Sequence, residues 1–162
     1  MRVRVSEDAS LPHDPSDAIG REAWRASSAE PYAAEDGNLW MRFEGPEGRA
    51  VVEISGDPLT IRLRERDGTL LATLVEIGFG EGGRASASLE VAPGERFFGF
   101  GEKSGGLDKR GRVLRMRSQD ANLRLQGDPL YASIPFFLAF RTEAGRSRSL
   151  GVLLDAPGPS LF

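Results

Sequence analysis

The sequence predicts an all-β fold, an antiparallel β-sandwich, from three observations. Short runs of alternating apolar and polar residues recur along the chain from Leu39 onward. Turn-forming residues separate these runs, with 20 glycines and 10 prolines among 162 residues. Apolar residues at helical spacing are almost absent. Many short strands divided by turns are typical of packed antiparallel sheets and argue against a helical or doubly wound fold.

Strands are expected at residues 39–43, 49–54, 59–66, 70–77, 85–91, 97–100, 113–117, 134–141 and 150–155. The first two are joined across turn residues, GPEG at 45–48. Residues 59–66 alternate strictly, with leucine and isoleucine on one face and threonine and arginine on the other. This alternation predicts one buried and one solvated face. Asp67-Gly68 predicts a two-residue hairpin turn of primed geometry, after which residues 70–77 return antiparallel.

The later strands differ in which faces they bury. The inward side of the strand at 85–91 is expected to carry Ala85, Ala87, Leu89 and Val91. Pro93-Gly94 predicts a turn after it. Residues 134–141 are apolar on both faces, which predicts a central strand covered on both sides. The final residues, 156–162, contain two prolines and a glycine and break the strand.

The segment 1–38 is predicted to be an irregular N-terminal segment, because its apolar residues are sparse. Within it we expect a short edge strand at Arg2–Val5 and one helical turn capped by Asp14-Pro15-Ser16-Asp17. Residues 39–162 are expected to form the β-sandwich. A chain of this length is not expected to hold a second domain.

The charge of the chain is small but uneven. A net charge of −3 and an isoelectric point near 5.3 argue against general affinity for nucleic acid or an anionic membrane. Residues 97–141 hold eight basic and four acidic residues, a local charge of +4, which leaves −7 on the remainder. The segment 97–141 is therefore positively charged, whereas the rest of the chain is negatively charged.

The composition excludes several kinds of chemistry. The chain has no cysteine, so disulfides, thiolate zinc ligands and a cysteine nucleophile are excluded. Its one histidine, His13, lies in the segment 1–38 and supports neither a Ser-His-Asp triad nor a metal site. We expect no cofactor and no metal. Neither a signal-peptide core nor an apolar stretch of about 20 residues is present, so a soluble, cytoplasmic protein is expected.

Four motifs carry a resemblance to a known family. They are FFGFGEK at 97–103, LDKRG at 107–111, SQDA at 118–121 and DPLYASIPFF at 128–137. In this order they resemble the end of the N-terminal β-sandwich domain of glycoside hydrolase family 31, which includes α-glucosidases and α-xylosidases. The resemblance implies a galactose mutarotase-like supersandwich. Further strands and a (β/α)8 barrel follow in that family, so the chain looks like an excised domain, truncated at its C-terminal end.

The function implied by the resemblance is that of a non-catalytic domain in a retaining α-glycosidase, where it braces the barrel and adds a loop to the sugar pocket. Retention needs two carboxyl groups roughly 5–5.5 Å apart, and the family carries both on the barrel. No catalytic residue is therefore expected here, and the isolated chain is expected to be inactive. The alternative pairs are Glu102 with Asp108 and Asp120 with Asp128. Acids in a polar loop are more often separately solvated or paired with arginine.

Asp120 is the one substrate-binding residue that the resemblance implies. The motif at 118–121 matches the place where the family sends a loop into the barrel mouth and an aspartate bonds sugar hydroxyls. An ionised carboxylate is a strong acceptor for such groups. The family often has Trp-Asn-Thr before Asp-Ala, whereas this chain has Arg117-Ser118-Gln119, which leaves the sugar preference open. The alternative is an Asx-turn, in which Asp120 bonds its own backbone.

Other features of the segment 97–141 are expected to have structural roles. Gly99-Phe100-Gly101 lacks the third glycine and the helix of a nucleotide-binding loop, so these glycines are expected to let a strand bend or a backbone approach closely. Glu102 and Lys103 are expected to form local ion pairs. Core packing, rather than stacking on sugars or bases, is expected for Phe97, Phe98, Phe136, Phe137 and Phe140.

An arginine stripe is formed by Arg110, Arg112, Arg115, Arg117 and Arg124. We expect Arg115 and Arg117 on one strand face and Leu114 and Met116 on the other. Nucleic-acid binding would need exposed aromatic residues among these charges, and none are interleaved. A solvated face, or a surface docked against acidic residues of the barrel, is the expectation.

Three other functions remain open. One is a stand-alone carbohydrate-binding sandwich module without enzymatic activity. Another is a mutarotase acting alone, which requires histidine together with a glutamate base. The third is a nucleic-acid module, whose binding would weaken steeply with salt. The expected partners are a carbohydrate substrate and the barrel, without nucleic acid or membrane. A homodimer through an open sheet edge is also expected to be accessible, because unpaired edge groups recruit a second strand.

Overall fold

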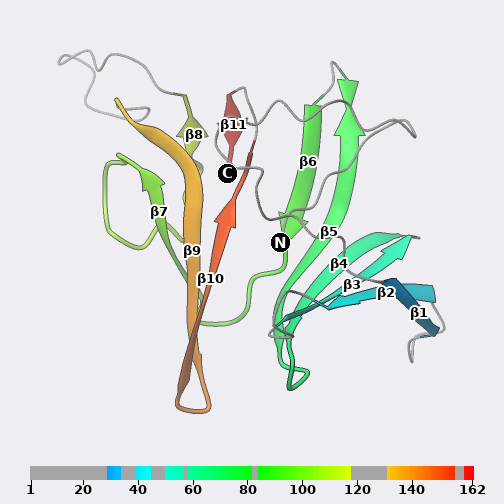
Figure 1. Cartoon of the computed structure of the whole chain (residues 1–162). Coiled ribbons are helices and arrows are strands. Elements are labelled where there is room, and N and C mark those ends of the chain that lie inside the picture. Colours follow the sequence, from blue (N-terminus) through cyan, green and yellow to red (C-terminus); the bar gives the residue numbers. More distant parts are fainter. Residues whose placement is uncertain are drawn as a thin grey trace, which may run out of the picture. The chain divides into compact units, whose positions relative to one another are not determined.

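A computed structural model describes residues 29–33, 39–44, 50–56, 58–81, 84–117, 131–155 and 159–162. The regular elements in these ranges are the strands β1 to β11 (Figure 1), and all their pairs are antiparallel. The predicted all-β class is confirmed. Within the same ranges, no helix is long and apolar enough to cross a membrane.

The described residues divide into two compact units, one up to residue 90 and the other from residue 91 to residue 162. The strand predicted at Arg2–Val5 and the helical turn predicted at Asp14–Asp17 lie outside the described residues. The division of the chain at residue 38 stays a prediction.

The first unit contains a six-stranded sheet in which each strand lies beside the next one in the sequence. Its strands are β1 (Ala29–Ala33), β2 (Leu39–Glu44), β3 (Ala50–Gly56), β4 (Leu59–Glu65), β5 (Leu70–Gly80) and β6 (Arg84–Leu89). The strands from β2 to β6 agree with the predicted ones, with ends within three residues. β1 pairs with β2 in a stretch where no strand was predicted.

One face of this sheet is apolar. Val52, Ile61 and Ala72 are buried there. The register places Leu63 opposite both Val52 on β3 and Ala72 on β5. Residues directly opposite each other in adjacent strands share a face, so the buried face predicted for residues 59–66 is confirmed.

The other face of β4 is less exposed than the alternation predicts. Arg62 and Arg64 are half-buried. The guanidinium carbon of Arg62 lies 4.1 Å from the centre of the Trp40 ring, which is 2% exposed. Arg64 Nε donates to Glu53 Oε2 at 2.8 Å. The arginine stems therefore cover a tryptophan and a carboxylate instead of extending into solvent.

The turn between β4 and β5 corrects the predicted two-residue primed turn. The amide of Gly68 donates to Glu65 O at 3.0 Å, and the amide of Glu65 donates to Thr69 O at 2.9 Å. Gly68 has a φ of +87°, but Asp67 is not among the positive-φ residues. A type I′ turn needs positive φ at both central residues. The loop is therefore a three-residue one, a type I turn closed by a glycine bulge.

β6 also departs from prediction. It is an edge strand, with a neighbour on one side only in the sheet order. Ala85 and Ala87, expected to point inward, are exposed, and Val91 beyond the strand is 46% exposed. The alternation of small residues in this strand therefore does not mark a buried face, because alanine burial carries little hydrophobic free energy to enforce one.

The second unit holds two smaller sheets. In one, β9 (Ser133–Glu143) lies between β10 (Arg146–Leu153) and β7 (Arg96–Gly101), and β9 and β10 form a long hairpin (Figure 1). In the other, β8 (Arg115–Met116) pairs with β11 (Ser160–Leu161). The central position predicted for residues 134–141 is confirmed. β11 is a correction, because the tail was expected only to break a strand.

The two faces of β9 are unequally covered. Phe137 and Ala139 are buried. Ile134, Phe136 and Leu138 are exposed by 52%, 39% and 42%, so the expected cover on both sides is found on one side only in the described part of the chain. Most of the phenylalanines pack as expected, with ring centroids 5.8 Å apart for Phe97–Phe137 and 6.5 Å apart for Phe98–Phe140. Phe136 is the exception.

Candidate functional site

The described residues on both sides of the segment 118–130 form the candidate site. We call residues 99–117 and 131–133 the loop base. They include the last three residues of β7, the whole of β8 and the first residue of β9. All of them belong to the second unit. Loops that carry function are usually held by a rigid scaffold, so the contacts of the loop base determine how the segment is presented.

The loop base begins with three consecutive residues of positive φ, Gly99 at +114°, Phe100 at +67° and Gly101 at +75°. The register between β7 and β9 shifts at this point. A Cβ on Gly99 would meet Phe136 O at 2.8 Å, and one on Gly101 would meet Ala132 O at 2.5 Å. The glycines allow a close approach of two backbones, as predicted, and no phosphate role is needed to account for them.

Phe100 holds its unfavourable backbone conformation through its ring. It is 5% exposed. Its ring stacks on Phe137, with centroids 5.1 Å apart and planes 16° apart, and meets the edge of Phe162 at 5.3 Å. A positive φ costs a non-glycine residue roughly 1–2 kcal/mol, and burial of an aromatic side chain contributes more than this amount. The ring therefore anchors the start of the loop base in the core.

Glu102 and Lys103, for which local ion pairs were predicted, bond uncharged groups among the described residues. The amide of Glu102 donates to Ala132 O at 2.7 Å, and Glu102 Oε2 accepts the amide of Ala132 at 3.3 Å. Lys103 Nζ donates to Arg115 O and to Ser133 Oγ, both at 3.0 Å. Both side chains therefore bond residues that lie close in the sequence to the segment 118–130.

Two further cations of the loop base cap backbone carbonyls. Lys109 is 8% exposed, and its Nζ donates to Ser104 O at 3.0 Å. Arg110 Nη1 donates to Ala92 O at 3.1 Å and to Glu95 O at 2.6 Å. Hydrogen bonds with a charged donor are stronger than neutral ones. These residues therefore stabilise an irregular backbone that has few ladder bonds.

Asp108 is bonded by backbone amides. Its Oδ1 accepts from Phe97 N at 3.1 Å and from Arg110 N at 3.0 Å. These two bonds hold the pKa of Asp108 below its ordinary value of 3.8, and the bond from Phe97 has the larger effect. The positive charges of Arg96 and Arg110 lower that pKa further. Asp108 is therefore an ionised turn residue, poorly suited to act as a general acid.

The predicted orientation of the arginine stripe is confirmed in the described part. Arg115 and Arg117 are exposed, whereas Leu114 and Met116 are 3% and 4% exposed. Arg124 lies outside the described residues. The alternation predicts the buried face correctly here, because Leu114 and Met116 are large enough for their burial to fix the strand's orientation.

Asp120, the expected sugar-binding residue, lies outside the described residues, as does Asp128. Its contact with sugar stays a prediction. The two described carboxylates that were weighed as a pair, Glu102 and Asp108, accept bonds from different backbone amides. No group of three or more potential metal ligands was found among the residues described.

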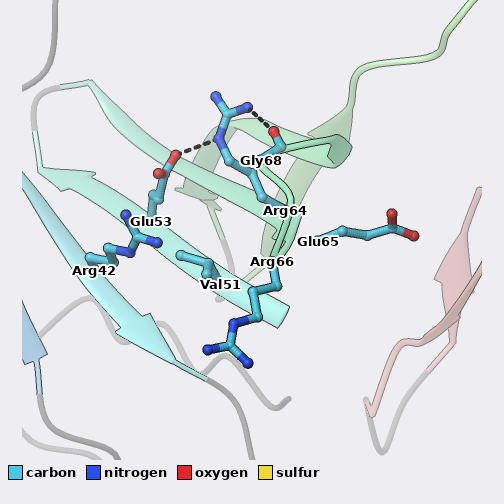
Figure 2. Close-up of a pocket in the computed structure, with 7 residues that line it drawn as sticks. All are labelled: Arg42, Val51, Glu53, Arg64, Glu65, Arg66 and Gly68. Carbon is cyan, nitrogen blue, oxygen red and sulfur yellow. Dashed lines mark hydrogen bonds and ion pairs between the residues drawn. The ribbon is translucent and has the colours of Figure 1, made fainter. Parts of the chain in front are cut away.

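A hollow in the sheet of the first unit is a weaker candidate. It is lined by Arg42, Val51, Glu53, Arg64, Glu65, Arg66 and Gly68 (Figure 2). Its volume of about 170 Å³ is below the ~300–1,000 Å³ of most ligand pockets. Arg64, one of the lining residues, already bonds Glu53 Oε2 and, at 3.0 Å, Gly68 O. The hollow therefore belongs to the packing of the sheet.

Sequence reasoning missed the structural role of the two lysines. The chain contains 19 arginines and two lysines, and both lysines, Lys103 and Lys109, lie in the loop base. Each directs its ammonium group at a backbone carbonyl. The rarity of lysine, together with its confinement to one short segment, was a signal that could have been used.

Comparisons with known proteins agree on one family. The family described as the glycosyl hydrolase 31 N-terminal galactose mutarotase-like domain matches residues 1–162. The chain is 33% identical over 111 residues to α-glucosidase 2 of Bacillus thermoamyloliquefaciens, covering 66% of this chain and 14% of that protein.

A solved structure gives the corresponding comparison of folds. The chain is similar to a glycoside hydrolase 31 dextranase of Flavobacterium johnsoniae, complexed with glucose. The TM-score is 0.53 and the identity 22%, over 77% of this chain and 17% of the dextranase chain. This likeness supports the fold. In both comparisons the chain spans less than a fifth of the length of the other protein.

Proposed function

The chain belongs to the family of glycosyl hydrolase 31 N-terminal galactose mutarotase-like domains, and from this premise we propose that it is the non-catalytic domain of a retaining α-glycosidase. Its role there is to brace the catalytic barrel and to contribute a loop to the sugar pocket. The observation that carries the proposal is the family match over residues 1–162, together with the small share of each relative that the chain spans.

The substrate is an α-linked glucoside or a related sugar. The similarity to an α-glucosidase supports this class. The contacts of Glu102 and Asp108 support a non-catalytic role, because both carboxylates accept backbone amides. The carboxyl pair that retention requires is assigned to the barrel.

Asp120 is the residue that reaches the sugar in this proposal, through hydrogen bonds from sugar hydroxyls to its carboxylate. Replacement of Asp120 by alanine in the full-length enzyme raises KM or reduces kcat. Wild-type kinetics in the Asp120→Ala variant would show that Asp120 does not bind the sugar.

Two experiments test the proposal as a whole. The isolated chain of residues 1–162 is assayed on aryl α-glucosides, where no turnover above background is expected and measurable turnover would contradict the non-catalytic role. The gene is read beyond the codon for Phe162, where a barrel with an aspartate nucleophile is expected. A stop codon there would favour a stand-alone carbohydrate-binding module.

Two finer points belong to the same proposal. The enzyme is placed in the cytoplasm, which fractionation of cells expressing the natural gene tests. The isolated chain is also proposed to form a homodimer through β6, whose outer edge has no neighbouring strand in the sheet order.

A further inference from the structure

One face of the sheet formed by β7, β9 and β10 is apolar and exposed. On β9 it carries Ile134, Phe136 and Leu138, which are 52%, 39% and 42% exposed. On β10, Leu153 lies opposite Phe136 and is 44% exposed. On β7, Phe98 lies opposite Leu138. Because residues directly opposite each other in adjacent strands share a face, these five side chains form one surface, which we call the open face.

The side chains of the open face lie against one another across the strands. Gly151 on β10 lies opposite Leu138. A Cβ on Gly151 would meet Phe136 Cε2 at 3.1 Å and Leu138 Cδ2 at 3.7 Å, so both side chains extend over β10 at a position that carries no side chain. Single exposed apolar residues are common on protein surfaces, whereas a continuous apolar patch usually marks an interaction surface.

The opposite face of the same sheet is already covered. Phe137 and Ala139 are 6% and 3% exposed. The ring of Phe137 contacts those of Phe97, Phe100 and Phe162, with centroids 5.8, 5.1 and 5.9 Å apart. The exposure of the open face is therefore a property of one side of the sheet and not of the whole second unit.

Charge is confined to the margin of the open face. Within the described strands β7, β9 and β10, Arg96 is the charged residue that the register places on it, opposite Phe140 at the start of β7. Toward the end of the β9–β10 hairpin the face becomes polar, where the hydroxyls of Thr142 and Ser147 lie 3.1 Å apart. An apolar centre depleted of charge is typical of the core of an interface. The open face therefore fits an apolar partner surface.

We propose that the open face is covered by the part of the enzyme that follows Phe162, an inference that rests on the proposed function. This chain spans 14% of the α-glucosidase and 17% of the dextranase chain, so most of each relative lies outside it. In the proposed enzyme the polypeptide continues from Phe162, whose ring contacts Phe137 on the covered face of the same sheet. Docking of the downstream polypeptide is then intramolecular, which gives it a high effective concentration that a second copy lacks. The open face is the surface through which the domain braces the rest of the enzyme.

Photocrosslinking in the full-length enzyme identifies the partner of the open face. Phe136 is replaced by p-azidophenylalanine, which keeps the aromatic ring, and the irradiated enzyme is digested and analysed by mass spectrometry. We expect the cross-linked peptides to come from residues beyond 162 of the same molecule. Cross-links confined to residues 1–162, or cross-links to a second molecule, would overturn the proposal.

Thiol labelling measures whether the open face is covered. Leu138→Cys and, as the matched control, Arg146→Cys each introduce a thiol into a chain that has none, and any cysteine beyond residue 162 is replaced by serine. Arg146 begins β10 on the same hairpin and is exposed. In the native full-length enzyme a maleimide is expected to label position 138 at least about tenfold more slowly than position 146, because a covered site reacts only after local opening. After unfolding in urea the two rates should be similar.

The outcomes separate this inference from the proposed function. If Leu138→Cys does not fold, Leu153→Cys places the thiol on the neighbouring strand of the same face. Equal labelling rates at the open face and at position 146, in an enzyme that hydrolyses an aryl α-glucoside, overturn the inference and leave the proposed function in place. A gene that ends after the codon for Phe162 contradicts the proposed function, and the inference with it.

Discussion

A methyl group on Gly101 would lie 2.5 Å from the carbonyl oxygen of Ala132. The same methyl group would lie 2.7 Å from the amide nitrogen of Ile134. Both are backbone atoms, which cannot rotate away as the end of a side chain can. At Gly101, therefore, the backbone of β7 passes close to the backbone of residues 132–134.

Replacement of Gly101 by alanine is expected to destabilise the protein by about 2–4 kcal/mol, because a backbone clash adds to the strain of a positive φ. Gly111→Ala is the matched control. Gly111 has a similar φ, +73°, but a Cβ there would have nothing within 4 Å, so a loss of about 1 kcal/mol is expected. Urea denaturation measures both, and equal losses would show that the close approach has no energetic weight.

The bond between Arg64 and Glu53 gives a second prediction (Figure 2). Arg64→Leu is expected to destabilise the protein by about 1.5–3 kcal/mol, since it removes a charged donor from a carboxylate whose side chain is 8% exposed. Arg141→Leu removes a longer pair, at 3.9 Å, with Glu143, whose side chain is 66% exposed, and the loss is expected to be smaller. A larger loss in Arg141→Leu would contradict this ranking.

Asp108 predicts a dependence of stability on pH. Its pKa is lowered below 3.8 in the folded protein, chiefly by the amide of Phe97. The stabilisation is therefore present above pH 3.8, the ordinary value, and is lost as the pH falls through the folded-state pKa. Asp108→Asn keeps an acceptor oxygen but does not titrate, so its unfolding free energy should fall less than that of the wild type between pH 6 and pH 3. If denaturant titrations show the same fall in unfolding free energy for the wild type and Asp108→Asn, Asp108 does not contribute this pH dependence.

The sequence predicts strands better than it predicts their connections. The alternation at 59–66 correctly predicts a buried face, because burial of large aliphatic side chains supplies enough free energy to fix which face of the strand points into the core. The same pattern made of small residues failed at Ala85 and Ala87. The Asp67-Gly68 pair failed for another reason, since Asp and Gly also suit a type I turn followed by a glycine bulge.

The contacts of the loop base were beyond sequence reasoning. Lys103 bonds a hydroxyl 30 residues away and a backbone carbonyl 12 residues away. A carbonyl is present at every residue, so the sequence does not indicate which one a lysine will reach. The role of Gly99 and Gly101 was predictable, because glycines at the end of an apolar strand usually mark a bend or a close approach of another backbone.

The open edge of β6 predicts self-association of the isolated chain. Ala85 and Ala87 are small and exposed, and Arg84 is the one charged residue of this strand. Edge strands with little charge or bulk pair readily with a second copy. We expect a dimer that forms with increasing concentration and that Ala87→Lys disfavours, measured by light scattering. A clean monomer over a wide concentration range would contradict this prediction.

The most direct test is a crystal structure of the full-length enzyme with glucose bound. An oxygen of the Asp120 carboxylate should lie about 2.5–3.0 Å from a sugar hydroxyl, with Lys103 bonded to Arg115 and Ser133 as it is here. An Asp120 carboxylate that bonds its own backbone in an Asx-turn, away from the sugar, would contradict the account.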